Sequence, residues 1–248
     1  MEAKSLKRIM DAAMAAFDKS NPRDNLKQAH IRIYLGIFTM SITDGFRLSR
    51  GYETDIDQGD EAAFGVDAQQ LHYIVRQHAN GEVTMMPHGD ELHLTYDDGV
   101  EYRLPITRET SSAQIADMGP MNGTVWVPID GANMRKLMKS WLQDDRCFLH
   151  IRSDGWFELV KRPFIRVSDD ELKAGKKDSY GAAEVIFTTV CESEMMVVEV
   201  NPRYLRDAFQ HLGKTGYIGV HPKKIVVSDA RNDIPSYMHI IMPMRSKS

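Results

Sequence analysis

The chain has 248 residues, of which 42% are hydrophobic and 27% charged, and its formal net charge is −4. This composition is typical of a folded protein with one large or two ordinary domains, and it excludes a disordered chain. The two cysteines, Cys147 and Cys191, exclude a disulfide scaffold and fit a reducing cytoplasm. No apolar run is long enough to span a membrane, and the first residues lack the layout of a secretion signal. We therefore expect a cytoplasmic protein.

Apolar residues recur at helical spacing over residues 4–17 and predict the first helix. Residues 29–43 alternate or run apolar, which is typical of strands. They end in the segment Thr43-Asp44-Gly45-Phe46-Arg47-Leu48. Its Asp-Gly pair predicts a hairpin turn, because glycine accepts positive φ and the aspartate side chain bonds its own backbone. Taken alone, this turn is most simply structural.

The first half continues with a short strand over residues 64–66 and a helix that Asp67 caps and that runs to about residue 79. Strand candidates follow over residues 82–86, 91–96 and 100–105. The polar, glycine-containing segment 107–123 is the predicted linker.

The second half repeats this order. Asp130 is a candidate cap for a helix to residue 142, and Asn201-Pro202 starts another that ends at Gly213. Between these two helices we expect a hairpin over residues 148–161, a charged excursion over 168–181, and strands over 185–190 and 195–200. Strands over residues 217–220, 224–228 and 236–243 close the chain.

The two halves align at the start of each helix, with offsets of 128 and 134 residues. The pattern therefore predicts a duplicated unit of helix, hairpin, helix and three strands. Each unit would pack two helices on a mostly antiparallel sheet, which is an α+β layer. We place the two domains at residues 1–120 and 121–248.

Positive charge is concentrated in the predicted helices. The segments 4–17, 130–142 and 201–214 each carry +2 and the segment 67–79 carries 0, so the rest of the −4 chain carries −10. A protein with this distribution can present its helices to phosphate while its other surfaces repel it. The alternative is that these are ordinary solvated helix faces. Because Lys and Arg are good helix formers, this alternative explains the same charge distribution equally well.

The sequence shows no catalytic motif. It lacks a phosphate-binding glycine loop, a nucleophile elbow and a dinucleotide fingerprint, and its nine histidines are scattered without zinc-helix spacing. Acidic clusters such as Asp97-Asp98 are most simply solvated loops. We expect no cofactor, no metal and no enzymatic activity, although a small-molecule enzyme of another mechanism stays open as an alternative.

Three segments resemble one family. Residues 43–48 are similar to the Thr-Asp-Gly-x-Arg-Leu segment of the bacterial DNA polymerase III β subunit, the sliding clamp. Residues 240–245, Ile-Ile-Met-Pro-Met-Arg, are similar to the Val-Val-Met-Pro-Met-Arg ending of that family. Residues 201–208 resemble its last helix. The segments stand in the family's order within a duplicated unit, and the resemblance spans nearly the whole chain.

The resemblance implies two tandem DNA-clamp domains, similar to the middle and last of the three domains in family members. A two-domain chain would need three copies to build a pseudo-six-fold ring, so we expect a homotrimer whose edge strands pair between chains. It implies a processivity factor that encircles duplex DNA without sequence readout and tethers a replicative polymerase. A clamp-fold adaptor or decoy that binds replication proteins without encircling DNA is the alternative.

The resemblance also implies binding residues. In the family, polymerases and loader proteins insert a linear peptide into an apolar pocket between the last two domains, and Trp126 or Pro128 would complete that pocket here. Phe46 replaces the histidine common in the motif, and strand alternation would place Ile240 and Met242 on one face. The predicted pocket residues are Leu26, Thr43, Gly45, Phe46, Arg47, Leu48, Trp126, Ile240 and Met242. The predicted DNA-facing residues are Lys4, Lys7, Arg8, Arg135, Lys136, Lys139, Arg203, Arg206 and Lys214.

Overall fold

The structure, a computed structural model, describes residues 1–54, 56, 61–78, 80–108, 120, 122–140, 146–151, 156–160, 183–188, 196–231 and 233–244. The chain packs as two compact units. Unit 1 comprises residues 1–119 and 228–240, and unit 2 comprises residues 120–227 and 241–248. The first break falls beside residue 120, and the assignment of two clamp domains with that boundary remains a proposal.

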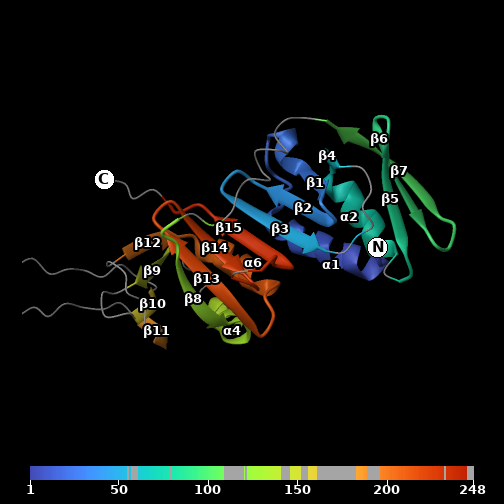
Figure 1. The fold of residues 1–248 in the computed structure, drawn as a ribbon. Coiled ribbons are helices and arrows are strands. Elements are labelled where there is room, and N and C mark those ends of the chain that lie inside the picture. Colours follow the sequence, from blue (N-terminus) through green and yellow to red (C-terminus); the bar gives the residue numbers. More distant parts are fainter. Residues whose placement is uncertain are drawn as a thin grey trace, which may run out of the picture. The chain divides into compact units, whose positions relative to one another are not determined.

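Unit 1 places two helices on one antiparallel sheet (Figure 1). The helices are α1 (Ala3–Ala13), which continues as a 3₁₀ turn (Met14–Ala16), and α2 (Ala68–Gln77). A second 3₁₀ turn (Asp24–Lys27) precedes the sheet. The strands are β1 (Gln28–Tyr34), β2 (Ile37–Thr43), β3 (Arg47–Glu53), β4 (Ala62–Asp67), β5 (Val83–His88), β6 (Glu91–Tyr96) and β7 (Glu101–Thr107). Their order in the sheet is β5-β6-β7-β4-β1-β2-β3, and β15 (Tyr237–Ile241) follows β3.

Helix α1 lies very close to β3. Its apolar stripe, which includes Leu6, Ile9 and Met10, is fully buried in the core of unit 1. A Cβ added at Gly51 of β3 would lie 2.8 Å from Cγ2 of Ile9 and 2.9 Å from its Cα, so only glycine permits this approach. The Ser49 hydroxyl donates to the Ala12 carbonyl oxygen at 2.6 Å on the same face. These contacts fix which face of β3 the helix covers.

Helix α2 begins as the sequence predicts. The Asp67 carboxylate accepts a hydrogen bond from the Gln70 amide at 2.7 Å, which satisfies one of the free amides of the first turn. Leu71, Ile74 and Val75 are buried beneath it. The helix ends at Gln77, two residues before the predicted end.

Unit 2 has the same kinds of element. Its helices are α4 (Gly131–Ser140) and α6 (Pro202–Gln210). The Asp130 and Asn201 side chains cap them, accepting from the Ala132 amide at 2.8 Å and the Arg203 amide at 2.9 Å, as expected from the sequence. The strands are β8 (Val125–Asp130), β9 (Cys147–Ile151), β10 (Trp156–Val160), β11 (Ala183–Thr188), β12 (Met196–Val200), β13 (Thr215–His221) and β14 (Lys224–Ser228). One group of neighbours is β14-β13-β8, and the other is β11-β10-β9-β12.

The predicted duplication is confirmed, with four strands in each repeat where the predicted unit had a hairpin. In chain order, α1, four strands, α2 and three strands are followed by β8, and then by α4, four strands, α6 and three strands. Helix α4 begins 128 positions after α1, and α6 begins 134 positions after α2. The first four strands of each repeat have the same neighbours, β3-β2-β1-β4 and β11-β10-β9-β12. The fold is therefore α+β, with each repeat placing two helices on antiparallel strands.

Some elements differ from expectation. Strand β3 runs to Glu53, within a segment whose polar residues gave no strand pattern. Strand β8 follows the predicted linker, at residues for which no strand was predicted. The strand β15 ends at Ile241, so strand alternation does not place Met242 relative to Ile240. Most of the predicted linker 107–123, the excursion 168–181, the turn 153–155 and the residues Trp141 and Leu142 lie outside the described residues. In the described part of the chain, no helix is long and apolar enough to cross a membrane.

Candidate functional site

The segment 43–48 forms the turn between β2 and β3. Gly45 has φ of +93°, a backbone conformation that favours glycine. The Thr43 hydroxyl donates to the Arg47 carbonyl oxygen at 2.7 Å and accepts from the Gly45 amide at 3.1 Å. The turn is thus closed by its own side chains as well as by its backbone.

Asp44 holds the turn together. One carboxylate oxygen accepts from the Phe46 and Arg47 amides at 2.9 and 3.0 Å, and the other accepts from Nε of Arg47 at 2.9 Å. The Asp44 and Arg47 side chains are only 5% and 10% exposed. The side-chain amide of Asn21 donates to the Asp44 carbonyl oxygen at 3.0 Å, which ties the turn to the segment after α1. Arg47 therefore shapes the turn from within.

The other predicted pocket residues of unit 1 surround this turn. A Cβ added at Gly45 would lie 3.5 Å from Cδ1 of Leu26, so these two predicted pocket residues are neighbours. Phe46 projects outward and is 64% exposed, whereas Leu48 is 2% exposed. The outward ring of Phe46 thus lies beside a rigid turn and near the half-buried Leu26. Such an arrangement can contact an apolar side chain of a peptide.

Three predicted pocket residues lie elsewhere in the chain. Trp126, in β8 of unit 2, packs against β13, where a Cβ at Gly219 would lie 3.1 Å from its ring. Ile240 is buried in β15 of unit 1, and Met242 belongs to unit 2 and is 41% exposed. The structure thus brings together Leu26, Thr43, Gly45, Phe46, Arg47 and Leu48, and the full predicted pocket remains a proposal.

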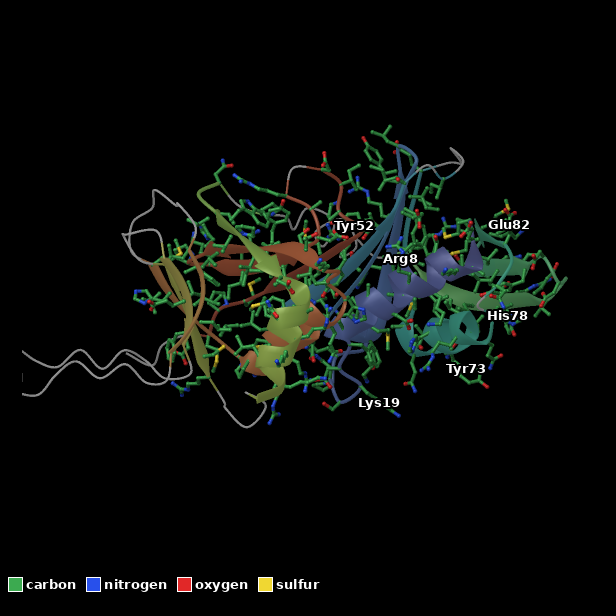
Figure 2. All side chains as sticks on the ribbon, turned by 90° about the horizontal axis from the view of Figure 1, so that it is seen from below. Arg8, Lys19, Tyr52, Tyr73, His78 and Glu82 are labelled. Atoms are coloured by element: carbon green, nitrogen blue, oxygen red, sulfur yellow. The ribbon has the colours of Figure 1, made fainter. Side chains whose placement is uncertain are left out.

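Four predicted DNA-facing residues are engaged within their own unit. Lys7 pairs with Asp11 at 2.5 Å and Arg206 pairs with Asp207. Arg8 donates to Glu53 at 2.9 Å and to the Tyr52 carbonyl oxygen at 3.1 Å, and Figure 2 labels Arg8 and Tyr52. The Arg135 guanidinium donates to the Phe209 carbonyl oxygen at 3.2 Å and to that of Leu212, so it binds the C-terminal end of α6.

The other five predicted residues are exposed, and none forms an ion pair with a carboxylate in the described part of the chain. They lie on α1, α4 and α6 or just after α6, and they are Lys4, Lys136, Lys139, Arg203 and Lys214. Exposed ammonium and guanidinium groups of this kind contact phosphate without reading sequence.

Asp11 links the two helices of unit 1. Its carboxylate lies 3.1 Å from Nε2 of His72 on α2, besides its contact with Lys7. Burial opposes ionisation of this carboxyl, but the hydrogen bonds from Lys7 and His72 outweigh it and lower the pKa of Asp11 below 3.8. This polar contact joins α1 to α2, and nothing in the sequence beyond helical spacing indicated it.

A second cluster of titratable side chains lies at the C-terminal end of α2. The His78 ring, labelled in Figure 2, stacks on Tyr96 at 4.2 Å between centroids. Its Nε2 lies 2.8 Å from the Tyr102 hydroxyl. Burial, with Tyr102 and Asp98 nearby, raises the pKa of Tyr96 to about 12. Among the described residues, no group of three or more His, Cys, Asp or Glu side chains could hold a metal ion.

Comparisons with known proteins find their matches among solved structures. No family model matches the sequence, and no curated protein matches it either. The DNA polymerase III β chain of Streptococcus pneumoniae TIGR4 superimposes with a TM-score of 0.77 at 17% identity, covering 99% of this chain and 64% of its own. A Pseudomonas aeruginosa sliding clamp with ligand gives 0.77 at 17% identity, covering 99% and 66%.

A third neighbour carries a peptide. The Helicobacter pylori β clamp bound to a DNA ligase peptide gives a TM-score of 0.71 at 9% identity, covering 100% of this chain and 66% of its own. The present chain thus spans slightly less than two thirds of the length of these proteins. Its fold is that of the bacterial DNA polymerase III β subunit, the sliding clamp, in a shortened form.

Proposed function

We propose that this protein is a DNA sliding clamp, a non-enzymatic ring that encircles duplex DNA and tethers a DNA polymerase through a linear peptide. The sliding-clamp fold over the whole chain is the observation that carries the proposal. Since the chain is shorter than those clamps, three copies would complete a ring of six repeated units.

The strand neighbours indicate how such a ring would close. Strand β3 is the third strand of the first repeat, and β15 is the last strand of the second repeat. The two strands are neighbours in the sheet. The Tyr52 amide of β3 donates to the Ser236 carbonyl oxygen at 3.0 Å. The equivalents of β3 and β15 in the other repeats are β11 and β7. Among the described strands, none lies beyond β11, and β7 pairs with β4 only at residues 106 and 107.

Repeat equivalence therefore pairs β7 of one copy with β11 of the next, head to tail. The backbone of β7 is suited to this. The Ile106 amide donates to the Asp90 carbonyl oxygen at 2.9 Å, so by alternation the Arg103 amide points away from β6 toward the unpaired edge. Pro105 has the same orientation as Arg103. Because its nitrogen also points away from β6, the lack of an N–H at Pro105 removes no hydrogen bond between β6 and β7.

DNA contact would come from the exposed basic residues of the helices. Lys136, Lys139, Arg203 and Lys214 in unit 2 and Lys4 in unit 1 are the principal candidates, because no described carboxylate forms an ion pair with them. Lys7, Arg8, Arg135 and Arg206 would act mainly by holding local structure. Such sparse, sequence-independent contacts allow a duplex to be held and to slide.

The partner peptide would bind at the turn 43–48. The rigid turn that Asp44 and Arg47 hold would present Phe46 beside the Leu26 side chain. The peptide-bound clamp of Helicobacter pylori supports a peptide-binding role for this fold. Polymerase and clamp-loader proteins are the proposed partners.

The solution mass tests ring formation directly. We expect light scattering to give three times the 28.2 kDa chain mass. Arg103→Pro, which removes one edge-facing N–H, should shift the protein toward monomer, while Arg103→Ala keeps that N–H and serves as the control. A monomer at micromolar concentration would instead favour the adaptor or decoy.

Encirclement needs a topological test. After loading, the protein should be retained on circular duplex DNA and lost when the same DNA is linearised. Equal retention on both forms would show surface binding in place of encirclement, even if the protein is a trimer.

A further inference from the structure

A hollow in unit 1 lies on the sheet face that α1 does not cover. Its volume is 430 Å³, and its walls come from β1, β2, β3 and the segment before β15. We name it the arginine groove after the residues that give it its character, Arg32, Tyr34, Arg50, Tyr52 and Ile234.

Strand alternation explains why the groove faces away from the helix. Ser49 and Gly51 contact α1, at Ala12 and Ile9 respectively. Residues 50 and 52 of the same strand therefore point to the other face of the sheet. The groove and the helix packing surface are on opposite sides of β3.

The floor of the groove is held in a fixed arrangement. Nε of Arg50 donates to the Ser41 hydroxyl at 2.8 Å, and its terminal nitrogen donates to the Tyr52 hydroxyl at 3.3 Å. The Tyr52 hydroxyl in turn lies 3.8 Å from the sulfur of Met238. Arg50 is only 5% exposed, so these contacts hold its guanidinium in place at the base of the hollow.

The rim combines a second arginine with apolar surface. The Arg32 guanidinium carbon lies 4.7 Å from the centre of the Tyr34 ring, and no described carboxylate forms an ion pair with it. A guanidinium stacked on a ring keeps its N–H edges available for a carboxylate. Tyr34 is 40% exposed and Ile234 is 51% exposed, so apolar surface flanks that edge. Asp233 on the same rim sets a limit on how much negative charge the groove accepts.

We propose that the arginine groove binds an acidic segment of a partner protein. One carboxylate of the segment would pair with Arg32, and a neighbouring apolar side chain would lie against Tyr34 and Ile234. The volume suits one or two side chains, and the rim carboxylate of Asp233 disfavours a nucleic-acid backbone. The occupant is therefore a short peptide with a carboxylate beside an apolar residue.

This site is separate from the turn 43–48. In the β2–β3 ladder, Thr43 pairs with Leu48 beside the turn, and Thr39 pairs with Tyr52 at the groove. Four residues of strand separate these two pairs, which is roughly 14 Å at about 3.4 Å per residue. One partner could therefore occupy both sites, or two partners could bind at once.

Two-dimensional NMR with the full chain tests the proposal. The probe is a short synthetic peptide in which aspartate and glutamate flank an isoleucine, and its control is the same peptide with asparagine and glutamine. We expect the acidic peptide, and not its amide counterpart, to shift the signals of Ile37, Thr39 and Ile234. Arg32→Glu should weaken its binding about tenfold or more, since it removes the charged donor and places a second carboxylate beside that of the peptide.

Matched variants separate the groove from general charge effects. Arg76→Glu on α2 makes the same change of charge on the surface away from the groove and should leave the affinity unchanged, whereas Ile234→Ser should reduce it. The proposal is overturned if millimolar peptide causes no shift at the groove, if the amide peptide binds equally well, or if Arg76→Glu weakens binding as much as Arg32→Glu. Equal shifts with a short DNA duplex would overturn it in favour of a nucleic-acid surface. None of these outcomes depends on whether the protein forms a ring.

Discussion

The Asp44 carboxylate lies 2.9 Å from Nε of Arg47 within a single turn, and both side chains are nearly buried. The same carboxylate accepts from two backbone amides of that turn. Asp44 therefore sets both the path of the backbone and the position of Arg47, and it was absent from the predicted pocket residues although it stands in the same motif.

Replacement of Asp44 tests this role. Asp44→Ala leaves Arg47 without its carboxylate and two amides without an acceptor, and we expect a loss of about 3 kcal/mol in the free energy of unfolding. Asp44→Asn keeps an acceptor oxygen for the amides and should lose less. Urea unfolding measures the difference, and a peptide titration at the turn should show weaker binding in the same order. Equal stability of the two variants would contradict the assigned role of the backbone bonds.

The contact of α1 with β3 depends on Gly51. Gly51→Ala would place Cβ 2.9 Å from both Cα and the carbonyl oxygen of Ile9, so the helix must move away from the sheet. Overpacking of this kind costs about 1–3 kcal/mol, and thermal unfolding should show a lower Tm. Adding Ile9→Ala should not restore stability, because two of the three contacts are with backbone. Gly213→Ala, which meets no atom within 4 Å, is the matched control.

The basic residues of α4 should divide into two classes. Arg135→Met removes the donor to the carbonyls at the end of α6, and we expect unit 2 to lose about 1–2 kcal/mol of stability. Lys136→Glu and Lys139→Glu lie on exposed positions and should change stability by less than about 0.5 kcal/mol. The double lysine variant should bind duplex DNA more weakly, with a lower salt dependence. This division would be contradicted if Arg135→Met reduced the affinity for DNA and the double lysine variant did not.

Much of the fold could be predicted from local signals. The caps Asp67, Asp130 and Asn201 mark helix starts because their side chains accept amides that no helix turn can satisfy. The Asp-Gly turn was predicted because Gly45 needs positive φ. The duplication followed from helix spacing alone. These features depend on residues close together in the sequence.

Features set by distant residues could not be predicted. Strand β3 has a polar sequence because Ser49 and Gly51 serve contact with α1 while Arg50 and Tyr52 build the opposite face, so no apolar alternation marks it. Arg135 was indistinguishable in sequence from its lysine neighbours, and only the folded position of α6 shows that it binds the carbonyls of that helix. The composition of a helix face thus overestimates the positive charge that stays unpaired on it.

Tyr96 and Tyr102 should respond in opposite ways to loss of their hydroxyls. The Tyr96 hydroxyl is buried with no hydrogen-bond partner among the described residues, whereas that of Tyr102 contacts His78 at 2.8 Å. We expect Tyr96→Phe to be at least as stable as the parent at neutral pH and Tyr102→Phe to be less stable by about 1 kcal/mol. Because burial raises the pKa of Tyr96 from 10.0 to about 12, the folded state keeps a proton that the unfolded state releases. The parent should therefore lose stability as pH rises through this interval, and Tyr96→Phe should lose less. Urea unfolding measured up to about pH 11 would contradict the assignment if both proteins declined equally.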